Sequence, residues 1–257
     1  MRWVAVGTLL VALLGGCGAA DVPAPATPPP TTQAGKVQAL PVYYVADTRA
    51  GQRLYREFHQ VTTADPASDA VREMFGAAID PDYHTLWASG AALRSPVVTE
   101  GGVITVDLTG VAGKPAQLAL QQLVFTVQGA LQSTDPVRVL VDGQPLTPQP
   151  IDRGDAYALR SLVQIDTPAN GATVGRQVEV TGEAAVFEAT VHWELLRDGA
   201  VVRSGFTMSA EGQRFAPYRF TLSLEPGVYT IRVLEDDPSD GEGRPVLTDD
   251  KKITVTA

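Results

Sequence analysis

The second half of the sequence constrains the fold most, because every patterned segment in it has the pattern of a β-strand. Turn residues such as Asp198-Gly199 and Glu225-Pro226-Gly227 separate short segments in which apolar and polar residues alternate. There are seven such segments: SLVQI, QVEVTG, ATVHWELL, AVVRSGFT, YRFTLSL, VYTIRVLE and KKITVT. Strands of this length and spacing predict two antiparallel sheets packed face to face.

We therefore expect residues 162–257 to form an all-β, immunoglobulin-like sandwich, with Trp193 of the third segment in its core. The disulfide of antibody domains cannot form there, since the only cysteine of the chain is Cys17.

Strand and helix patterns alternate in the part before it, residues 37–149. PVYYVAD, RLYREFHQV, GVITVDLTG and VRVLVDG have the composition of strands. Asp65-Pro66 offers an N-cap followed by proline at the first helical position, and apolar residues then recur at helical spacing up to Ile79. Pro115 opens a second helix with an apolar stripe from Leu120 to Leu131. The order predicts an α+β domain with two helices on a mixed sheet.

Both halves resemble known bacterial domains. The segments VYYVAD, RLYREFHQV, DPDYHTLW, GVITVDLTG, ALQQLVFTV and VRVLVDG are similar in order and spacing to the GerMN domain of sporulation and germination proteins and of actinobacterial lipoproteins. IDTPANGATV, VTGEAAVFEATVHWEL and EPGVYTIRVLE resemble the immunoglobulin-like domain that often follows GerMN in spore-germination proteins. The resemblance implies non-enzymatic domains, the first related to ring-building modules of envelope assemblies, and it brings no catalytic residues.

The N-terminus reads as an export signal. Arg2 precedes an apolar run, Trp3 to Leu14, which is too short to span a bilayer of about 30 Å. Leu14-Gly15-Gly16-Cys17 resembles the bacterial lipobox, in which the peptide is cut before a cysteine that carries diacylglycerol. We expect residues 1–16 to be a signal peptide and Cys17 the lipid attachment site. An ordinary signal with a chance cysteine is the alternative.

Two proline-bearing segments are expected to connect these parts. Residues 17–36 hold five prolines among Ala and Thr and read as an extended tether. Residues 150–161 read as a hinge between the two domains. The lipid would then hold the protein on the extracytoplasmic face of the cell membrane, because a pair of acyl chains anchors firmly.

Charge and motifs exclude several function classes. A formal net charge of −9 argues against nucleic acid as a partner. The three histidines, His59, His84 and His192, form no H-x-x-x-H pair, and no G-x-S-x-G, Walker or G-x-G-x-x-G motif occurs. We expect no catalytic residue, metal ion or cofactor, and we place His59 and His192 on exposed strand faces.

Two clusters remain as candidates for ligand binding. Asp82, Tyr83, His84 and Trp87 could form a surface for a sugar or a peptide, or a plain turn with Trp87 packed beneath it. The acidic run Glu235 to Glu242 has oxygens that suit Ca²⁺ but departs from the EF-hand spacing, so we expect a solvated loop.

Together these features predict a non-enzymatic lipoprotein with a structural or protein-binding role at the cell envelope. Its expected partners are the membrane, through the lipid, and envelope proteins or cell wall, in a process such as sporulation or germination. The alternative is a subunit that binds a cell-wall polymer, sugar or peptide. A third hypothesis is a hydrolase that uses His84 and Asp82.

Overall fold

A long two-stranded ribbon begins the part of the chain that the computed structural model describes, which is residues 35–236 and 242–257. Strands β1 (Lys36–Thr48) and β2 (Gly51–Thr63) pair antiparallel along their whole length. Gly51 closes the turn between them with φ +92°, a conformation that glycine adopts without strain. The predicted signal peptide and Cys17 lie outside the described residues.

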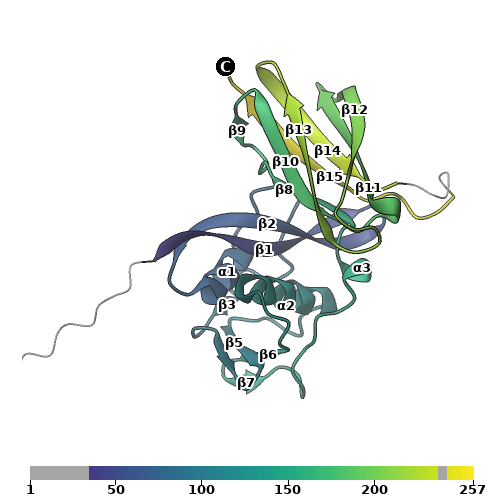
Figure 1. Cartoon of the computed structure of the whole chain (residues 1–257). Helices are drawn as coiled ribbons and strands as arrows, with labels where there is room; N and C mark the ends of the chain where they lie inside the picture. Colours follow the sequence, from purple (N-terminus) through teal and green to yellow (C-terminus); the bar gives the residue numbers. More distant parts are fainter. Residues whose placement is uncertain (1–34, 237–241) are drawn as a thin grey trace, which may run out of the picture. The chain divides into compact units, whose positions relative to one another are not determined.

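Two helices lie between this ribbon and a small second sheet (Figure 1). Helix α1 (Pro66–Phe75) begins as predicted, with the Asp65 carboxylate accepting from the Ser68 N–H at 3.2 Å. Helix α2 (Gln117–Leu131) begins two residues later than the expected Pro115, with Ala116 at its N-cap. Most of α2 is buried on every side, because the ribbon covers one face and the small sheet the other.

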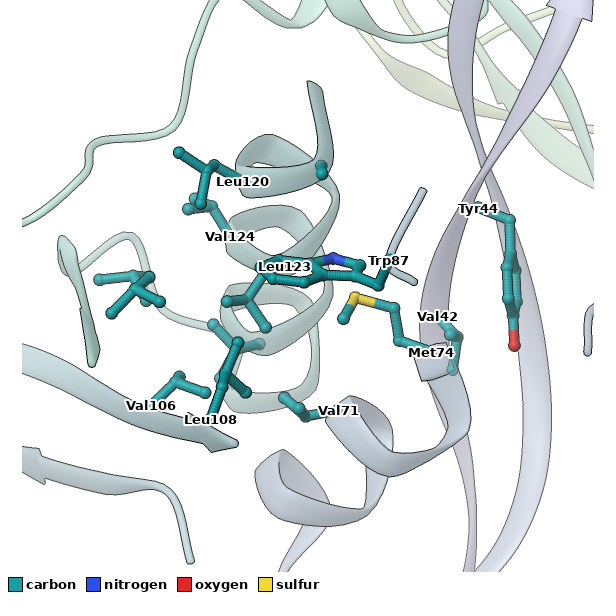
Figure 2. Close-up of a cluster of buried hydrophobic side chains, with 14 of the residues drawn as sticks. Val42, Tyr44, Val71, Met74, Trp87, Val106, Leu108, Leu120, Leu123 and Val124 are labelled. Atoms are coloured by element: carbon teal, nitrogen blue, oxygen red, sulfur yellow. The ribbon is translucent and has the colours of Figure 1, made fainter. Parts of the chain in front are cut away.

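The small sheet is mixed and completes the first half. Its central strands β5 and β6 are parallel, and the other pairs are antiparallel. Its members are β3 (Ala92–Leu93), β4 (Val98–Glu100), β5 (Val103–Thr109), β6 (Val137–Val141) and β7 (Gln144–Pro145). Val42 of β1, Val71 of α1, Leu123 of α2 and Val106 of β5 meet in one core (Figure 2). The mixture of helices and strands is as predicted, but β1 and β2 form a ribbon of their own instead of joining the mixed sheet.

The second half is built from two sheets that share one core. Their strand orders are β13-β10-β8 and β12-β11-β14-β15-β9, and every predicted strand overlaps one of them. Helix α3 (Ala156–Leu159) lies in the connecting segment and packs on the first half. The elements of the second half are β8 (Val163–Thr167), β9 (Thr173–Val174), β10 (Gln177–Ala184), η1 (Phe187–Ala189), β11 (Thr190–Arg197), β12 (Ala200–Met208), β13 (Ala216–Ser223), β14 (Gly227–Leu234) and β15 (Thr248–Val255). Trp193 is half-buried and stacks on Phe220 at 5.3 Å, so it lies at the margin of the core.

The described residues, 35–236 and 242–257, belong to one compact unit, in which the two halves are in direct contact. Strand β2 packs along β8, and the connecting segment is tied down as well. Ile151 pairs with Val137 of β6 through two backbone hydrogen bonds, and Arg160 is buried. The hinge predicted for residues 150–161 stays a prediction. No helix within the described ranges is long and apolar enough to cross a membrane.

Candidate functional site

A cleft of about 610 Å³ opens where the two halves meet. Three segments form its walls: the turn between β1 and β2, the loop that follows α1, and the facing parts of β14 and β15 with the residues just before β15. Its charged lining residues are Asp47, Arg49, Asp80, Asp82, Arg232, Asp249 and Asp250. A concave surface with converging polar groups is where a binding or catalytic site is expected first.

Four buried polar side chains form a cluster beside this cleft. The Nζ atom of Lys251 lies 2.8 Å from Asp80 Oδ2, 2.7 Å from Asp249 Oδ1 and 2.7 Å from the Tyr83 hydroxyl. Tyr83 in turn donates to Asp249 Oδ1 at 2.5 Å, and Asp249 Oδ2 accepts from the Ile165 N–H at 2.6 Å. We call Lys251, Asp80, Asp249 and Tyr83 the lysine cluster. Since Asp80 and Tyr83 come from the first half and the other two from β15, the cluster joins the halves.

The electrostatics of the lysine cluster keep its proton donors protonated. Burial by itself lowers the pKa of Lys251, but the Asp249 and Asp80 carboxylates outweigh this effect and raise it. Burial and the Asp249 charge raise the pKa of Tyr83 well above its ordinary value. Burial also raises the pKa of Asp249, against the opposing effect of Lys251. Lys251 therefore stays a cation and Tyr83 a neutral donor.

A second charged cluster joins the halves farther along β2. Arg56 binds Asp166 of β8 through two hydrogen bonds, Nε–Oδ1 at 3.2 Å and Nη2–Oδ2 at 2.7 Å. It also lies 3.2 Å from Glu183, which accepts from Arg160 at 2.7 Å. Paired forks of this kind fix the angle between the partners as well as their distance.

A chain of hydrogen bonds through Glu57, His59 and Glu73 holds the loop that carries Asp80 of the lysine cluster. Glu57 of β2 accepts from the backbone N–H groups of Ile79 and Asp80 at 2.9 and 2.7 Å, which holds the loop that presents Asp80. His59 lies between Glu57 and Glu73, at 3.2 and 2.8 Å. The expectation that His59 is exposed was wrong: it is 7% exposed, because α1 covers that face of β2. His192, in contrast, is partly exposed.

The four residues singled out in DPDYHTLW do not gather at one exposed place. Asp82 and Tyr83 line the cleft, although Tyr83 is buried. His84 pairs its backbone with Val45, and its Nε2 lies 4.0 Å from Asp47 Oδ2. Trp87 is buried in the core of the first half (Figure 2). It lies edge-on to Phe75 at 5.7 Å.

Sequence reasoning missed Lys251 and Asp249, although a signal was present. In KKITVT and the residues before it, the alternation that buries Ile253 and Val255 also places Lys251 and Asp249 on the buried face. A charged pair at core-facing positions of a strand needs a buried partner. Asp80 carried no comparable signal, because it lies in a loop.

The acidic run is only partly described, since Asp237 to Gly241 lie outside the described residues. Glu235 was expected to be solvated, but it is buried. Its carboxylate binds Arg244 and accepts a hydrogen bond from the Leu247 N–H at 2.6 Å. In the part of the chain that the structure describes, no group of three or more His, Cys, Asp or Glu could hold a metal ion.

Two family models match the chain. Residues 41–147 match the family described as sporulation and spore germination, and residues 162–242 match the immunoglobulin-like domain of bacterial spore germination. The two domain types inferred from the sequence are thus confirmed: a GerMN-like domain precedes an immunoglobulin-like domain. A comparison with curated proteins gave no match.

Three solved structures show partial similarity. The tandem GerMN domains of the sporulation protein GerM from Bacillus subtilis are 21% identical over 46% of this chain and 45% of that chain, with a TM-score of 0.40. A lytic polysaccharide monooxygenase from Jonesia denitrificans is 18% identical over 35% and 60%, with a TM-score of 0.26. An engineered protein is 13% identical over 57% and 38%, with a TM-score of 0.31. The chain covers less than two thirds of each.

Proposed function

We propose that this protein is a membrane-anchored, extracytoplasmic lipoprotein with a non-enzymatic, structural or protein-binding role at the cell envelope, linked to sporulation, germination or cell-wall processes. The two matched families support the sporulation or germination context. The lipobox-like Leu14-Gly15-Gly16-Cys17 supports the anchor. Net charge of −9 supports a partner other than nucleic acid.

The lysine cluster is the observation that carries the non-enzymatic part of this proposal. An ammonium group has three donors, and the three acceptors around Lys251 use all of them. A general acid or base must instead be free to exchange a proton with a substrate. A cation held by groups from both halves is suited to fixing their orientation, which makes the cleft a rigid binding surface.

The hydrolase hypothesis rests on His84 and Asp82 and has less support. Catalysis would need a base oriented by a third group and a nucleophile within reach. The charged group near the His84 ring is the exposed Asp47, at a long 4.0 Å. The binding-subunit alternative is favoured by the cleft, and the next subsection develops it.

Replacement of the chromosomal gene by variants tests the proposal. We expect His84→Ala and Asp82→Ala to leave the in-cell phenotype close to wild type, whereas deletion of either domain impairs it. In-cell crosslinking followed by purification of the lipidated protein should recover envelope proteins or wall fragments. If His84→Ala alone reproduced the full deletion while the protein stayed folded and membrane-bound, a catalytic or ligand site would replace this proposal.

A further inference from the structure

The outer face of the larger sheet in the second half carries two rows of side chains across its strands. Val191 and Leu195 of β11 point into the core, so the alternate residues His192 and Glu194 point outward. The strand register places their neighbours in line with them. One row is Phe206, His192 and Leu234, and the other is Ser204, Glu194, Arg232 and Asp250.

Phe206 forms the outer end of this surface. Its side chain is 67% exposed on the edge strand β12, next to a shallow hollow of about 260 Å³. The residues that line the hollow are His192, Trp193, Glu194, Ser204, Gly205, Phe206 and Leu234. An exposed flat ring beside hydroxyl, imidazole and carboxylate groups offers both an apolar platform and hydrogen-bonding partners.

The charged members of the two rows are already paired with one another. Arg232 binds Asp250 through Nε–Oδ1 at 2.9 Å and Nη2–Oδ2 at 2.8 Å, and its Nη1 lies 3.4 Å from Glu194 Oε2. His192 Nε2 lies 3.7 Å from Asp236 Oδ1. The surface therefore offers hydrogen bonds in fixed directions and has an excess of carboxylates, since Glu194, Asp250 and Asp236 outnumber Arg232.

This surface continues into the cleft. Arg232 and Asp250 line the cleft as well as belonging to the second row, and Glu194, which Arg232 contacts, lines the hollow. From β12 to β15 the row crosses three strand spacings, about 14 Å in all. One continuous surface thus runs from Phe206 to Asp82 and Asp47 on the far wall of the cleft.

The chemistry of this surface selects among partners. A polyanion would need an excess of cations, which the paired charges do not supply. An apolar helix would need a continuous apolar groove, but in the two rows only Phe206 and Leu234 are apolar. A β-strand partner would pair with the free edge of β12 and not lie across the face of the sheet. An uncharged chain of rings, each with an apolar face and a rim of hydroxyl or amide groups, meets every feature.

We infer that an uncharged glycan chain binds across strands β12, β11, β14 and β15, stacking on Phe206 and continuing into the cleft along Glu194, Arg232 and Asp250. The inference rests on the proposed envelope function, for which it names the class of partner. It does not depend on the lipid anchor.

Calorimetry with uncharged oligosaccharides tests the inference on the full-length protein in detergent. The probes are the hexamers of N-acetylglucosamine and of glucose. We expect at least one to bind the wild type, and Phe206→Ala to weaken that binding about tenfold or more, as for an aromatic hot spot. Glu194→Gln should weaken it by a smaller factor. Phe187→Ala is the matched control, because Phe187 is also exposed, at 52%, but belongs to neither row.

Two outcomes would overturn the inference: neither hexamer binds the wild type, or Phe206→Ala and Phe187→Ala bind the hexamers equally well. Circular dichroism of each variant confirms the fold, and Glu194→Gln provides the test if Phe206→Ala does not fold. Neither of these outcomes bears on the crosslinking and deletion experiments. The proposed envelope function can therefore stand while this inference fails, and the failure of each is seen in a different experiment.

Discussion

Lys251→Met is the substitution that most directly tests how the two domains are held together. Methionine fills similar space but leaves Asp80 and Asp249 buried, at 2% and 4% exposed, without their cation. Removing one partner of a buried ion pair costs about 3–5 kcal/mol, since the remaining charge is uncompensated. For a chain of this size that loss lowers the melting temperature by roughly 6–20 °C.

The loss should depend on pH in a defined direction. Burial already raises the pKa of Asp249 in the native protein, and without Lys251 it must rise further. An acid whose folded pKa lies above its unfolded value weakens the fold above the unfolded pKa, about 3.9, and this penalty disappears as the group is protonated. The difference in stability between wild type and Lys251→Met should therefore shrink as the pH falls.

A triple variant separates lost charge pairing from lost packing. In Asp80→Asn, Asp249→Asn, Lys251→Met no buried charge of the cluster remains. Replacing a whole buried ion pair is often close to neutral, so most of the stability lost by Lys251→Met should return.

Two tryptophans provide the assay, because Trp87 lies in the core of the first domain and Trp193 at the core margin of the second. Variants that keep one of them report urea unfolding of one domain each. We expect coincident transitions in the wild type and separate transitions in Lys251→Met. A stability loss below about 1 kcal/mol with transitions that stay coincident would refute the reasoning, because the cluster would then be worth no more than a surface pair.

Three further predictions concern single sites. Burial by itself lowers the pKa of His59, but hydrogen bonds to Glu57 and Glu73 outweigh this effect and raise the pKa. The stabilisation of the fold by protonated His59 is therefore complete below pH about 6.5 and is lost as the pH rises through the raised pKa. Urea titrations should show the largest deficit of His59→Gln at mildly acid pH, and a deficit that grew with pH would contradict this. Cys17→Ser should abolish fatty-acid labelling and move the protein out of the detergent phase; unchanged labelling would end the lipoprotein proposal. Calorimetry should detect no micromolar Ca²⁺ binding at Glu235–Glu242, because Arg244 occupies the Glu235 carboxylate, and binding lost in Asp237→Asn with Asp240→Asn would disprove it.

Local patterns predicted the elements of this fold well. The Asp65-Pro66 cap and the seven alternating segments depend on neighbours within a few residues, and each appears in the structure as expected. The separate β1–β2 ribbon could not be predicted from the sequence. A strand with this alternation fits a two-stranded ribbon and the mixed sheet equally well, so its residues do not decide between them. Its position depends on α2, whose buried faces contact the ribbon on one side and the small sheet on the other.

The candidate site was harder to predict because it is assembled from distant segments. Lys251 lies 171 residues from Asp80, and no pattern in either segment specifies the other. His59 shows the same limit, since an exposed and a buried histidine look identical within a strand until the covering helix is known. The row from Ser204 to Asp250 follows from strand register alone. The register between strands that are far apart in the sequence, such as β11 and β14, cannot be deduced from the residues of either strand.

The buried charges between the domains are best understood through the surface they align. A purely apolar interface would stabilise at least as well, but it tolerates small changes of angle, whereas hydrogen-bonded ions accept few geometries. Lys251 donates hydrogen bonds to acceptors of both domains, and Arg56 donates two hydrogen bonds to Asp166. The cleft needs such alignment, because one wall comes from the GerMN-like domain and the other carries Arg232 and Asp250, with which the row on the second domain ends. A polymer lying along that row meets both walls in register only if the domains keep one orientation. On this interpretation, burying the ions costs stability but fixes the orientation of the two domains, and this orientation keeps their shared surface continuous.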